Sequence, residues 1–206
     1  MIGLLFTTAD DAQPFLERYR QGAFGTLDEG ETAQDRSVVV GITGIGKIKA
    51  TFHTQQLLMK DGPDRVFHVG TSTALDPDLL IGEPVGISHV LEGDRVQLSA
   101  PSYPRMPLEI PFHELPEGTL VTHDHALSEG EEHSYWQRIA SLSDTTGYAI
   151  AYVAGQYGTP CHLARIPTGV LGEDNEDFHA TLKAARGTMA DLALQYLDDH
   201  EASEDE

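Results

Sequence analysis

The chain has 206 residues, 40% of them hydrophobic, and a formal net charge of −20 at pH 7. This length and composition suit one α/β domain with a sizeable core and argue against disorder for most of the chain. So acidic a surface repels nucleic acid and anionic membranes, and we expect neither as a partner. The single cysteine, Cys161, excludes an internal disulfide and a cysteine-based metal cluster, and it favours a reducing, cytoplasmic location.

The chain opens with an expected strand and helix. Met1–Thr7 is a β-prone run, too short for the apolar part of a signal peptide. A helix is expected over Thr8–Tyr19, because Thr8 is a good N-cap and two aspartates follow in the first turn. Pro14 fits this helix only if it starts near residue 11 or later. The Gly-rich, acidic segment 21–36 could hold a weak hairpin.

A second strand and helix follow. Ser37–Ile42 predicts a strand, and a helix is expected from about Ile48 to Met59. The two glycines of the connection TGIGK, residues 43–47, permit a tight turn. Its GxGK pattern resembles a phosphate loop only loosely, because a true phosphate loop is GxxxxGK followed by Ser or Thr and here Ile48 follows. We therefore do not expect nucleoside triphosphate binding.

The stretch from residue 64 to 94 organises the predicted fold. An apolar strand, Val66–Val69, is expected to end at Gly70, and three small hydroxyl residues follow it: Thr71, Ser72 and Thr73. Such a strand end leaves backbone N–H groups open to a ligand, in the crevice beyond the strands of an open α/β sheet. The alternative is two sheet strands joined by a loop, since a second β-prone run spans Val85–Leu91.

The next segment is Pro-rich. Residues 92–116 are interpreted as a loop or rim with a possible edge strand. A strand is expected over Gly118–His123, followed by Asp124, His125 and Ala126. The HDH sequence suggests metal ligands, but adjacent side chains of a strand diverge, so we expect no metal site there. Residues 129–132 form an acidic turn before an amphipathic stretch.

The last third alternates helix and strand again. A helix is expected from Asp144 to Gly158, a buried strand over Pro160–Ile166 ended by Thr168 and Gly169, and a helix over Asp174–Leu197. Residues 1–197 are interpreted as one domain and 198–206 as a frayed acidic tail. The predicted fold class is α/β: a single three-layer αβα domain with a mixed, mostly parallel central sheet.

Four stretches in this order resemble the nucleoside phosphorylase superfamily, and most closely its small nucleosidases for methylthioadenosine and S-adenosylhomocysteine or futalosine. The resemblance covers nearly the whole chain and is carried by IGLLFTTADD, TGIGKIKATFHTQQLL, FHVGTSTALDPDLLIGEPV and DTTGYAIAYVAGQYGTPCHLARIPTG. It implies cleavage of an N-glycosidic bond of a purine nucleoside-like ligand, a homodimer and no cofactor. Phosphorylases of the superfamily carry an Arg where this chain has His68, so the resemblance favours hydrolysis over phosphorolysis.

The resemblance also implies site residues. The water-activating carboxylate falls on Asp11, a shorter acid than the family's Glu. The glutamate of the family's D-M-E motif, which holds the ribose hydroxyls, falls on Thr146. The general acid of R-x-x-S-D, which would act on the purine, falls on Gly169. Further ligand contacts are implied by resemblance and position at Gly70, Thr71, Ser72, Ala126, Leu127, Thr145 and Thr168.

Two of the three catalytic positions therefore lack their functional group. Asp174, Glu173 or Asp124 could replace the missing acid, although a solvated acidic loop is the favoured interpretation of these residues. We expect purine nucleosidase activity to be absent or very weak. The leading interpretation is a divergent nucleosidase-like protein that binds, and could hydrolyse, a ribosyl compound. The alternative is an inactive family member that serves as a ligand sensor or partner subunit.

The excess of acidic residues predicts stability that depends on salt. Repulsion among these charges is screened over about 10 Å at 0.1 M salt and about 3 Å at 1 M salt. The melting temperature should therefore rise between low salt and 1 M potassium chloride, measured by circular dichroism or calorimetry. A melting temperature that stays constant or falls would rule out charge repulsion as a main destabilising term.

Overall fold

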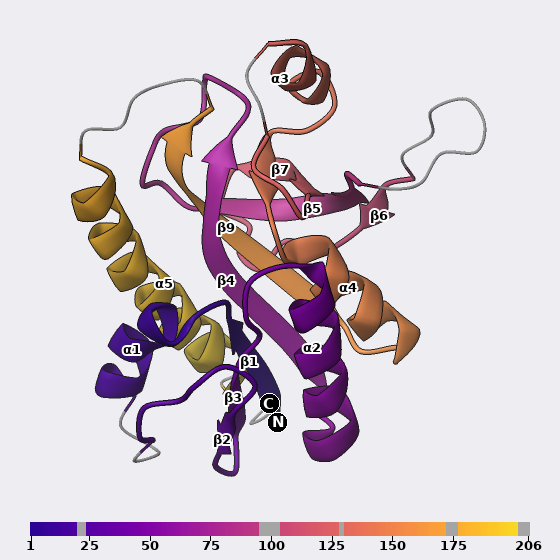
Figure 1. Ribbon diagram of the computed structural model, residues 1–206. Helices are drawn as coiled ribbons and strands as arrows, with labels where there is room; N and C mark the ends of the chain where they lie inside the picture. The colour runs from indigo at the N-terminus through magenta and orange to yellow at the C-terminus, as the bar shows by residue number, and fades with distance from the viewer. Residues whose placement is uncertain (20–23, 95–103, 128–129, 172–176, 202–206) are drawn as a thin grey trace.

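The computed structural model describes residues 1–19, 24–94, 104–127, 130–171 and 177–201. Its nine strands form one mixed sheet (Figure 1) with the order β2-β3-β1-β4-β8-β7-β5-β6, and β9 pairs with both β4 and β5. The strands are β1 (Ile2–Phe6), β2 (Thr32–Gln34), β3 (Val38–Ile42), β4 (Arg65–Ala74), β5 (Val85–Glu92), β6 (Met106–Pro107), β7 (Glu117–Thr122), β8 (Leu142–Asp144) and β9 (Cys161–Val170).

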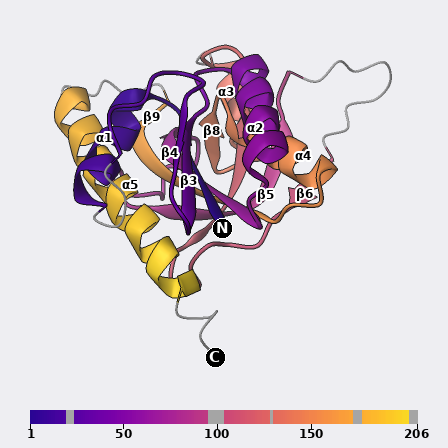
Figure 2. The same cartoon turned by 90° about the horizontal axis from the view of Figure 1, so that it is seen from below.

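Helices cover both faces of the sheet, which confirms the predicted three-layer class. α1 (Ala9–Arg18) and α5 (Phe178–Glu201) lie on one side of the central strands, and α2 (Lys47–Asp61) and α4 (Gly147–Gln156) lie on the other, as both views show (Figures 1 and 2). A short helix, α3 (Glu131–Trp136), sits beyond the ends of β5 and β7.

The central strands are apolar throughout because both of their faces are buried. In β1, Leu4 and Phe6 face the core under α1 and α5, whereas Leu5 faces the core under α2 and α4. The same alternation divides β3, where Val39 and Val40 belong to opposite cores. The first core is built around stacked aromatic rings, including Phe67 and Tyr196 with centroids 4.4 Å apart, so α5 is anchored directly on β4. Because successive side chains of a strand point to opposite faces, a short apolar run contributes side chains to the cores on both sides of the sheet.

Five strands of the sheet close into a ring. β4 pairs with β8, β8 with β7, β7 with β5, β5 with β9, and β9 again with β4. The remaining strands, β1, β3 and β2, extend from β4 as an open wing, in which β1 is parallel to both β3 and β4. The sheet is therefore mostly parallel but not fully open.

The expected end of the central strand at Gly70 is wrong, because β4 continues to Ala74. Thr71 and Ser72 pair with Ile166 and Pro167 of β9, which likewise runs to Val170 instead of ending near Ile166. On its other edge, β4 pairs with β1 only as far as His68 and with β8 only from Thr73. Along residues 69–72 that edge has no strand partner among the described residues, so open backbone is found beside the strand and not beyond its end.

The expectation about Pro14 is also wrong. Thr8 is the N-cap as predicted, with its side chain accepting from the Asp11 N–H, but α1 begins at Ala9 and Pro14 lies inside it. A proline there removes the hydrogen bond to the carbonyl of residue i−4, which is Asp10. Asp10 is exposed, so water can satisfy that carbonyl, while the reciprocal bond from the Thr8 N–H to the Asp11 carboxylate completes a capping box.

Other boundaries moved by a few residues. Asp144 ends the unpredicted strand β8 instead of opening a helix, and α4 begins at Gly147. The last helix begins at Phe178 instead of Asp174 and continues to Glu201, beyond the expected end at Leu197. The segment 21–36 contributes one strand, β2, whose partner is β3 outside that segment, so a hairpin within 21–36 is not found among the described residues. The edge strand of the Pro-rich segment is β6. Among the described residues, no helix is long and apolar enough to cross a membrane.

Candidate functional site

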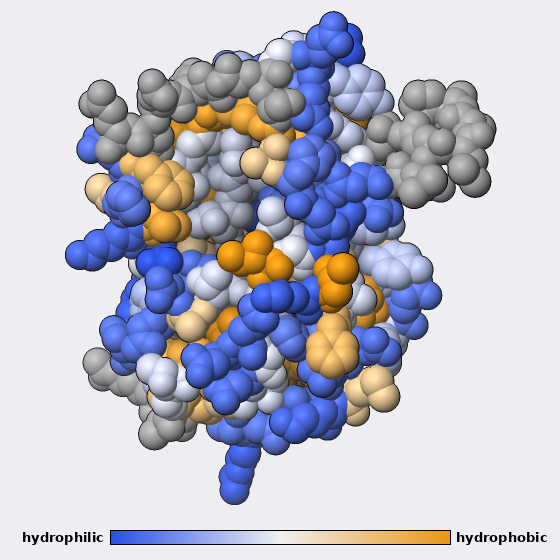
Figure 3. Space-filling model, viewed as in Figure 1, coloured by the Kyte–Doolittle hydropathy of each residue, from blue (hydrophilic) through white to orange (hydrophobic). Residues whose placement is uncertain are grey.

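A cavity of about 360 Å³ opens where β1 and β8 leave the edge of β4 unpaired. Figure 3 shows this face, with a hollow of intermediate hydropathy beside the apolar residues at the start of α5. Nine of the fifteen lining residues carry a hydroxyl group; the full lining is Thr7, Thr8, Asp11, Ile45, Thr71, Ser72, Thr73, Ser143, Asp144, Thr145, Thr146, Thr168, Phe178, Leu182 and Arg186. Crevices at such switch points in strand order are the usual ligand sites of α/β sheets.

The hydroxyl groups are brought together by four separate elements. Thr7 and Thr8 connect β1 to α1, and Thr71, Ser72 and Thr73 come from β4. Thr168 comes from β9, and the segment from Ser143 to Thr146 leads from β8 into α4. Ser72 is 6% exposed, and its Oγ has no hydrogen-bond partner within the described residues. A buried hydroxyl without a partner costs free energy, so Ser72 is ready to bond a ligand or an ordered water.

A smaller cavity of about 240 Å³ adjoins the first. The two share four lining residues, Thr73, Ser143, Asp144 and Thr145, so they form two compartments of one site. The smaller compartment is completed by His125, Ala126, Leu127 and Leu171. Gly169 pairs with Thr73, and Thr73 lines both compartments.

Asp11 lies at the wall of the larger compartment with both carboxylate oxygens engaged. Its Oδ1 accepts from Arg186 Nε at 3.1 Å, and its Oδ2 accepts from the Thr8 N–H at 3.2 Å. Arg186 also donates to Asp10 Oδ2 at 3.0 Å, which ties the start of α1 to α5. Each carboxylate oxygen has a second lone pair, so Asp11 retains the capacity to accept from a water in the cavity.

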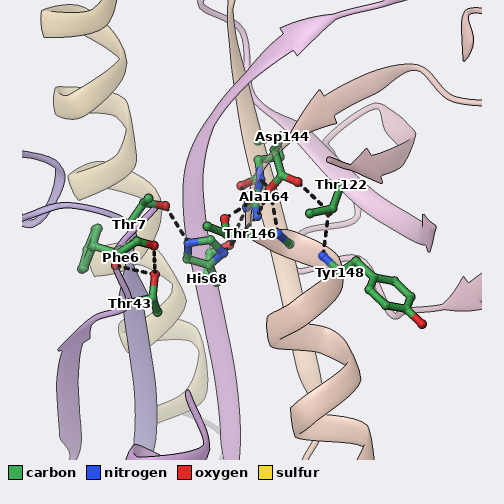
Figure 4. A network of polar contacts seen from close by, with 12 residues as sticks. Phe6, Thr7, Thr43, His68, Thr122, Asp144, Thr146, Tyr148 and Ala164 are labelled. Atoms are coloured by element: carbon green, nitrogen blue, oxygen red, sulfur yellow. Dashed lines mark hydrogen bonds and ion pairs between the residues drawn. The ribbon is translucent and has the colours of Figure 1, made fainter. Parts of the chain in front are cut away.

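A buried ion pair underlies the floor of the site (Figure 4). Arg165 of β9 is fully buried and donates from Nη2 and Nε to Asp144 Oδ2 at 2.8 and 3.0 Å. The other oxygen, Oδ1, accepts from Thr122 Oγ1 at 2.6 Å, and Thr122 in turn accepts from the Tyr148 N–H. Asp144 Oδ2 also accepts from the Gly147 N–H at 2.8 Å, at the positive end of α4. The pair thus connects β9, β8, β7 and α4.

The network fixes the protonation of His68. Arg165 Nη2 lies 2.9 Å from His68 Nδ1, and because a guanidinium only donates, Nδ1 is the acceptor. Nε2 therefore carries the hydrogen and donates to Thr7 Oγ1 at 3.2 Å (Figure 4). Burial, reinforced by the Arg165 charge, holds the pKa of His68 well below its ordinary value. His68 is thus a neutral, oriented spacer between the ion pair and the cavity wall.

The structure brings together most of the residues expected from the sequence. Asp11, Thr71, Ser72, Thr146 and Thr168 line the larger compartment, Ala126 and Leu127 line the smaller one, and Thr145 lines both. Gly70 lines neither, because it lies in β4 with the space above it facing Thr7 and His68. Asp174 and Glu173 lie outside the described residues, so their suggested role stays a prediction.

Asp124 does not sit in the site, contrary to the suggestion that it could supply a missing acid beside the crevice. Its Oδ1 accepts from the Lys47 N–H at 2.9 Å and so caps the start of α2, where Gly46 offers no side chain. Asp124 lines a separate groove between α2 and α4. A carboxylate fits this position because the first N–H groups of a helix have no partner within the helix.

The sequence interpretation missed Phe178, Leu182, Arg186 and the Asp144–Arg165 pair. The first three recur every four residues, so they occupy one face of α5, and that spacing could have indicated a lining face. Asp144 was assigned to a helix start, which concealed its role as the partner of a buried arginine. The two charges meet because β8, which carries Asp144, and β9, which carries Arg165, both pair with β4.

Comparison with known proteins shows which family and which solved fold this chain resembles. A profile of the phosphorylase superfamily matches residues 4–112. The chain is 23% identical over 227 residues to an aminodeoxyfutalosine nucleosidase of Helicobacter pylori, covering 96% of this chain and 98% of that protein. It is 25% identical over 190 residues to a 5'-methylthioadenosine/S-adenosylhomocysteine nucleosidase of Bacillus pumilus, covering 80% and 82% of the two chains. The crystal structure of the corresponding Campylobacter jejuni nucleosidase has the same fold, with a TM-score of 0.78 at 16% identity and 96% and 98% coverage.

The buried ion pair yields a stability prediction. Asp144→Asn or Arg165→Met leaves one buried charge uncompensated, which costs about 3–5 kcal/mol in free energy of unfolding. Asp191→Asn is the matched control, because it breaks the exposed pair between Arg18 and Asp191 and should cost about 0–1 kcal/mol. Denaturant unfolding measures both values. Equal, small losses for the buried and exposed pairs would contradict the central role given to Asp144 and Arg165.

Proposed function

The chain belongs to the phosphorylase superfamily, and on that basis we propose that it binds a purine nucleoside or related ribosyl compound and hydrolyses its N-glycosidic bond slowly. The observation that carries the proposal is the site of two joined compartments, one lined with hydroxyls and one with His125, Ala126, Leu127 and Leu171. A polyhydroxylated sugar suits the first and a flat base suits the second. The relatives named above as nucleosidases, aligned over most of the chain, favour the same ligand class.

Asp11 is the residue best placed to activate a water. Breaking the N-glycosidic bond develops positive charge on the sugar, and a carboxylate beside it both stabilises that charge and accepts the proton of the attacking water. The bonds from Arg186 and Thr8 fix the orientation of the Asp11 carboxylate. Ser72 Oγ, buried and without a partner among the described residues, could hold the same water.

Hydrolysis is favoured over phosphorolysis because the cations near the site are already engaged. Arg165 donates to Asp144 and to the backbone carbonyls of His68 and Ala164. His68 is neutral and bonded on both ring nitrogens. Arg186 is shared by two carboxylates. A phosphate would have to displace one of these bonds, and charged hydrogen bonds are the strong ones.

The activity is proposed to be slow because two functional groups are missing. Thr146 is neutral and cannot give sugar hydroxyls the charged hydrogen bond of a glutamate, worth about 1.5–3 kcal/mol. Gly169 has no side chain with which to protonate a leaving base, and general acid help contributes roughly 10²- to 10⁴-fold. Asp144, which lines both compartments, is committed to Arg165.

An inactive ligand-binding protein is the second candidate, favoured by the engagement of Asp11. If the Asp11 carboxylate serves only as a helix cap and an ion-pair partner, the site binds without cleaving. Such a protein would act as a sensor or as the partner subunit of another protein. Turnover separates the two candidates.

We further propose that the protein is a homodimer that pairs through α2 and α4. Most of the large apolar side chains that are exposed among the described residues lie on this face: Ile45, Ile48, Phe52, Met59, Tyr152 and Tyr157. Figure 3 shows apolar groups over the start of α2 with hydrophilic groups beside them. Ile45 also lines the larger compartment, so a second copy on this face would border the mouth of the site. Contiguous apolar patches of this kind mark interaction surfaces.

Turnover tests the function directly. The protein is incubated with methylthioadenosine, adenosine and inosine, with and without phosphate, and free base is measured by liquid chromatography. We expect slow release of free base from the unmodified chain, and a rise of on the order of 10²-fold in the double variant Thr146→Glu, Gly169→Asp. No release from the unmodified chain would favour the inactive candidate. Adding Asp11→Asn to the double variant should remove the gain. Rapid turnover by the unmodified chain would contradict the roles assigned to Thr146 and Gly169.

Dimerisation is tested by light scattering coupled to size-exclusion chromatography. The unmodified chain should elute with the mass of a dimer, and Ile48→Asp or Phe52→Asp should give a monomer, because a charge is buried without a partner at the interface. Leu80→Asp is the matched control, since Leu80 is an exposed apolar residue away from α2 and α4. A monomeric unmodified chain, or a dimer that survives both changes, would contradict the proposed interface.

A further inference from the structure

His125 is held between two carboxylates at the border of the smaller compartment. Its Nδ1 lies 3.1 Å from Asp94 Oδ1, and its Nε2 lies 2.9 Å from Glu132 Oε1. An ionised carboxylate only accepts hydrogen bonds, and a neutral imidazole has a single N–H. Both contacts are favourable only when both ring nitrogens carry hydrogen, so the two carboxylates together favour the charged imidazolium.

The neighbouring groups place one positive charge on the other side of Asp94. Asp94 Oδ2 accepts from the Asp124 N–H and from Lys47 Nζ at 3.0 Å, so Asp94 stays ionised and its second oxygen is left to His125. Lys47 also lies near Glu92 and Asp124, at 3.4 and 3.5 Å. Burial would raise the pKa of Asp94, but these hydrogen bonds outweigh burial and hold it below its ordinary value.

The other histidine of the HDH sequence behaves differently. The ring of His123 lies 5.3 Å from that of His125 and packs against Trp136, and burial lowers the pKa of His123. The hydrogen bond to Glu132 raises the pKa of His125, with further contributions from the Glu132 and Asp94 charges. The two pKa shifts therefore have opposite directions, so His125 holds its proton more strongly than an ordinary histidine and His123 less strongly.

These contacts connect three segments around the smaller compartment. Asp94 follows β5, His125 follows β7, and Glu132 lies in the first turn of α3. The far end of α3 is anchored by Trp136, which is buried against Leu75 and Val121. The near end is held by the contact of Glu132 with His125, whose own chain continues into Ala126 and Leu127 of the compartment wall.

We propose that protonated His125 is a latch that fastens the start of α3 to the segment after β5 and so fixes the wall of the smaller compartment at Ala126 and Leu127. When His125 loses its proton, one of its ring nitrogens presents a lone pair to a carboxylate. That contact becomes repulsive, and the latch no longer holds the start of α3. The direction of the pH dependence follows from the raised pKa of His125 in the folded state. The latch contributes fully to stability below about pH 6.5, the pKa of an unfolded histidine. This contribution is lost as the pH rises through the higher pKa of the folded state. The site should therefore hold the base part of a ligand more tightly in mildly acidic than in alkaline solution.

The latch itself is tested without any ligand. Ring titration by nuclear magnetic resonance should give His125 a pKa above 6.5 that falls in Glu132→Gln and in Asp94→Asn. Hydrogen exchange of the α3 amides, corrected for intrinsic rates, should be slower at pH 6.0 than at pH 8.5. The ratio of the corrected exchange rates at the two pH values is at most about tenfold for each unit by which the pKa of His125 differs between the folded and unfolded states.

Matched variants separate the latch from general effects of pH. His125→Gln does not titrate and should remove the pH dependence of α3 exchange, whereas His113→Gln, at an exposed histidine elsewhere, should leave it unchanged. Exchange in α3 that is independent of pH in the unmodified chain, or a pH dependence that survives His125→Gln, would overturn the proposal.

The ligand consequence rests on the proposed function and has its own readout. Adenine is the probe, and its dissociation constant is measured by calorimetry at pH 6.0 and 8.5. Weaker binding at pH 8.5 that becomes independent of pH in His125→Gln is the expected result. Binding that is independent of pH in the unmodified chain would overturn the control of the compartment by His125. A chain that does not bind adenine would count against the proposed function, while the exchange measurements would still decide the latch.

Discussion

The fold depends on how one buried charge is compensated. Arg165 lies within a mostly apolar strand, with no exposed surface, and its guanidinium must find acceptors there. Asp144, together with the carbonyls of His68 and Ala164, supplies them. Because these acceptors come from three different strands, they fix the relative positions of β4, β8 and β9. Residues of the same three strands line the hydroxyl-lined compartment, so the positions of β4, β8 and β9 determine its shape.

The layers of the fold could be predicted from the sequence because they depend on local alternation. Runs such as Val38–Ile42 are apolar on both faces, which indicates strands covered by helices on each side. The ends of β4 and β9 could not be predicted, because Gly70, Thr71 and Gly169 have the composition of a turn. They stay extended since each strand is the other's partner across residues 66–74 and 161–170. Pairing between segments so distant in sequence overrides the local preference of Gly and Thr.

For the site, too, the sequence indicated candidate residues but not their partners. Position after the first strand, together with the resemblance to nucleosidases, indicated Asp11 as a candidate, and Asp11 lines the larger compartment. What the Asp11 carboxylate touches could not be read from its neighbours, because Arg186 lies 175 positions further along the chain. The same reason concealed the cap that Asp124 provides for α2, which joins residues 77 positions apart. A residue type and its place in a motif indicate a candidate group, whereas its partners decide which of its atoms remain available.

The closed ring of strands has a consequence for how the chain reaches this structure. β5 and β9 meet over only two residue pairs, Val85 with Arg165 and Gly86 with Ala164, which are separated by about 80 positions in sequence. Contacts of such separation form slowly, because the entropy of closing a long loop is lost before the contact is gained. Arg165 sits at this closing pair and is fully buried in the folded chain. Removal of the guanidinium from water is therefore coupled to closure of the ring.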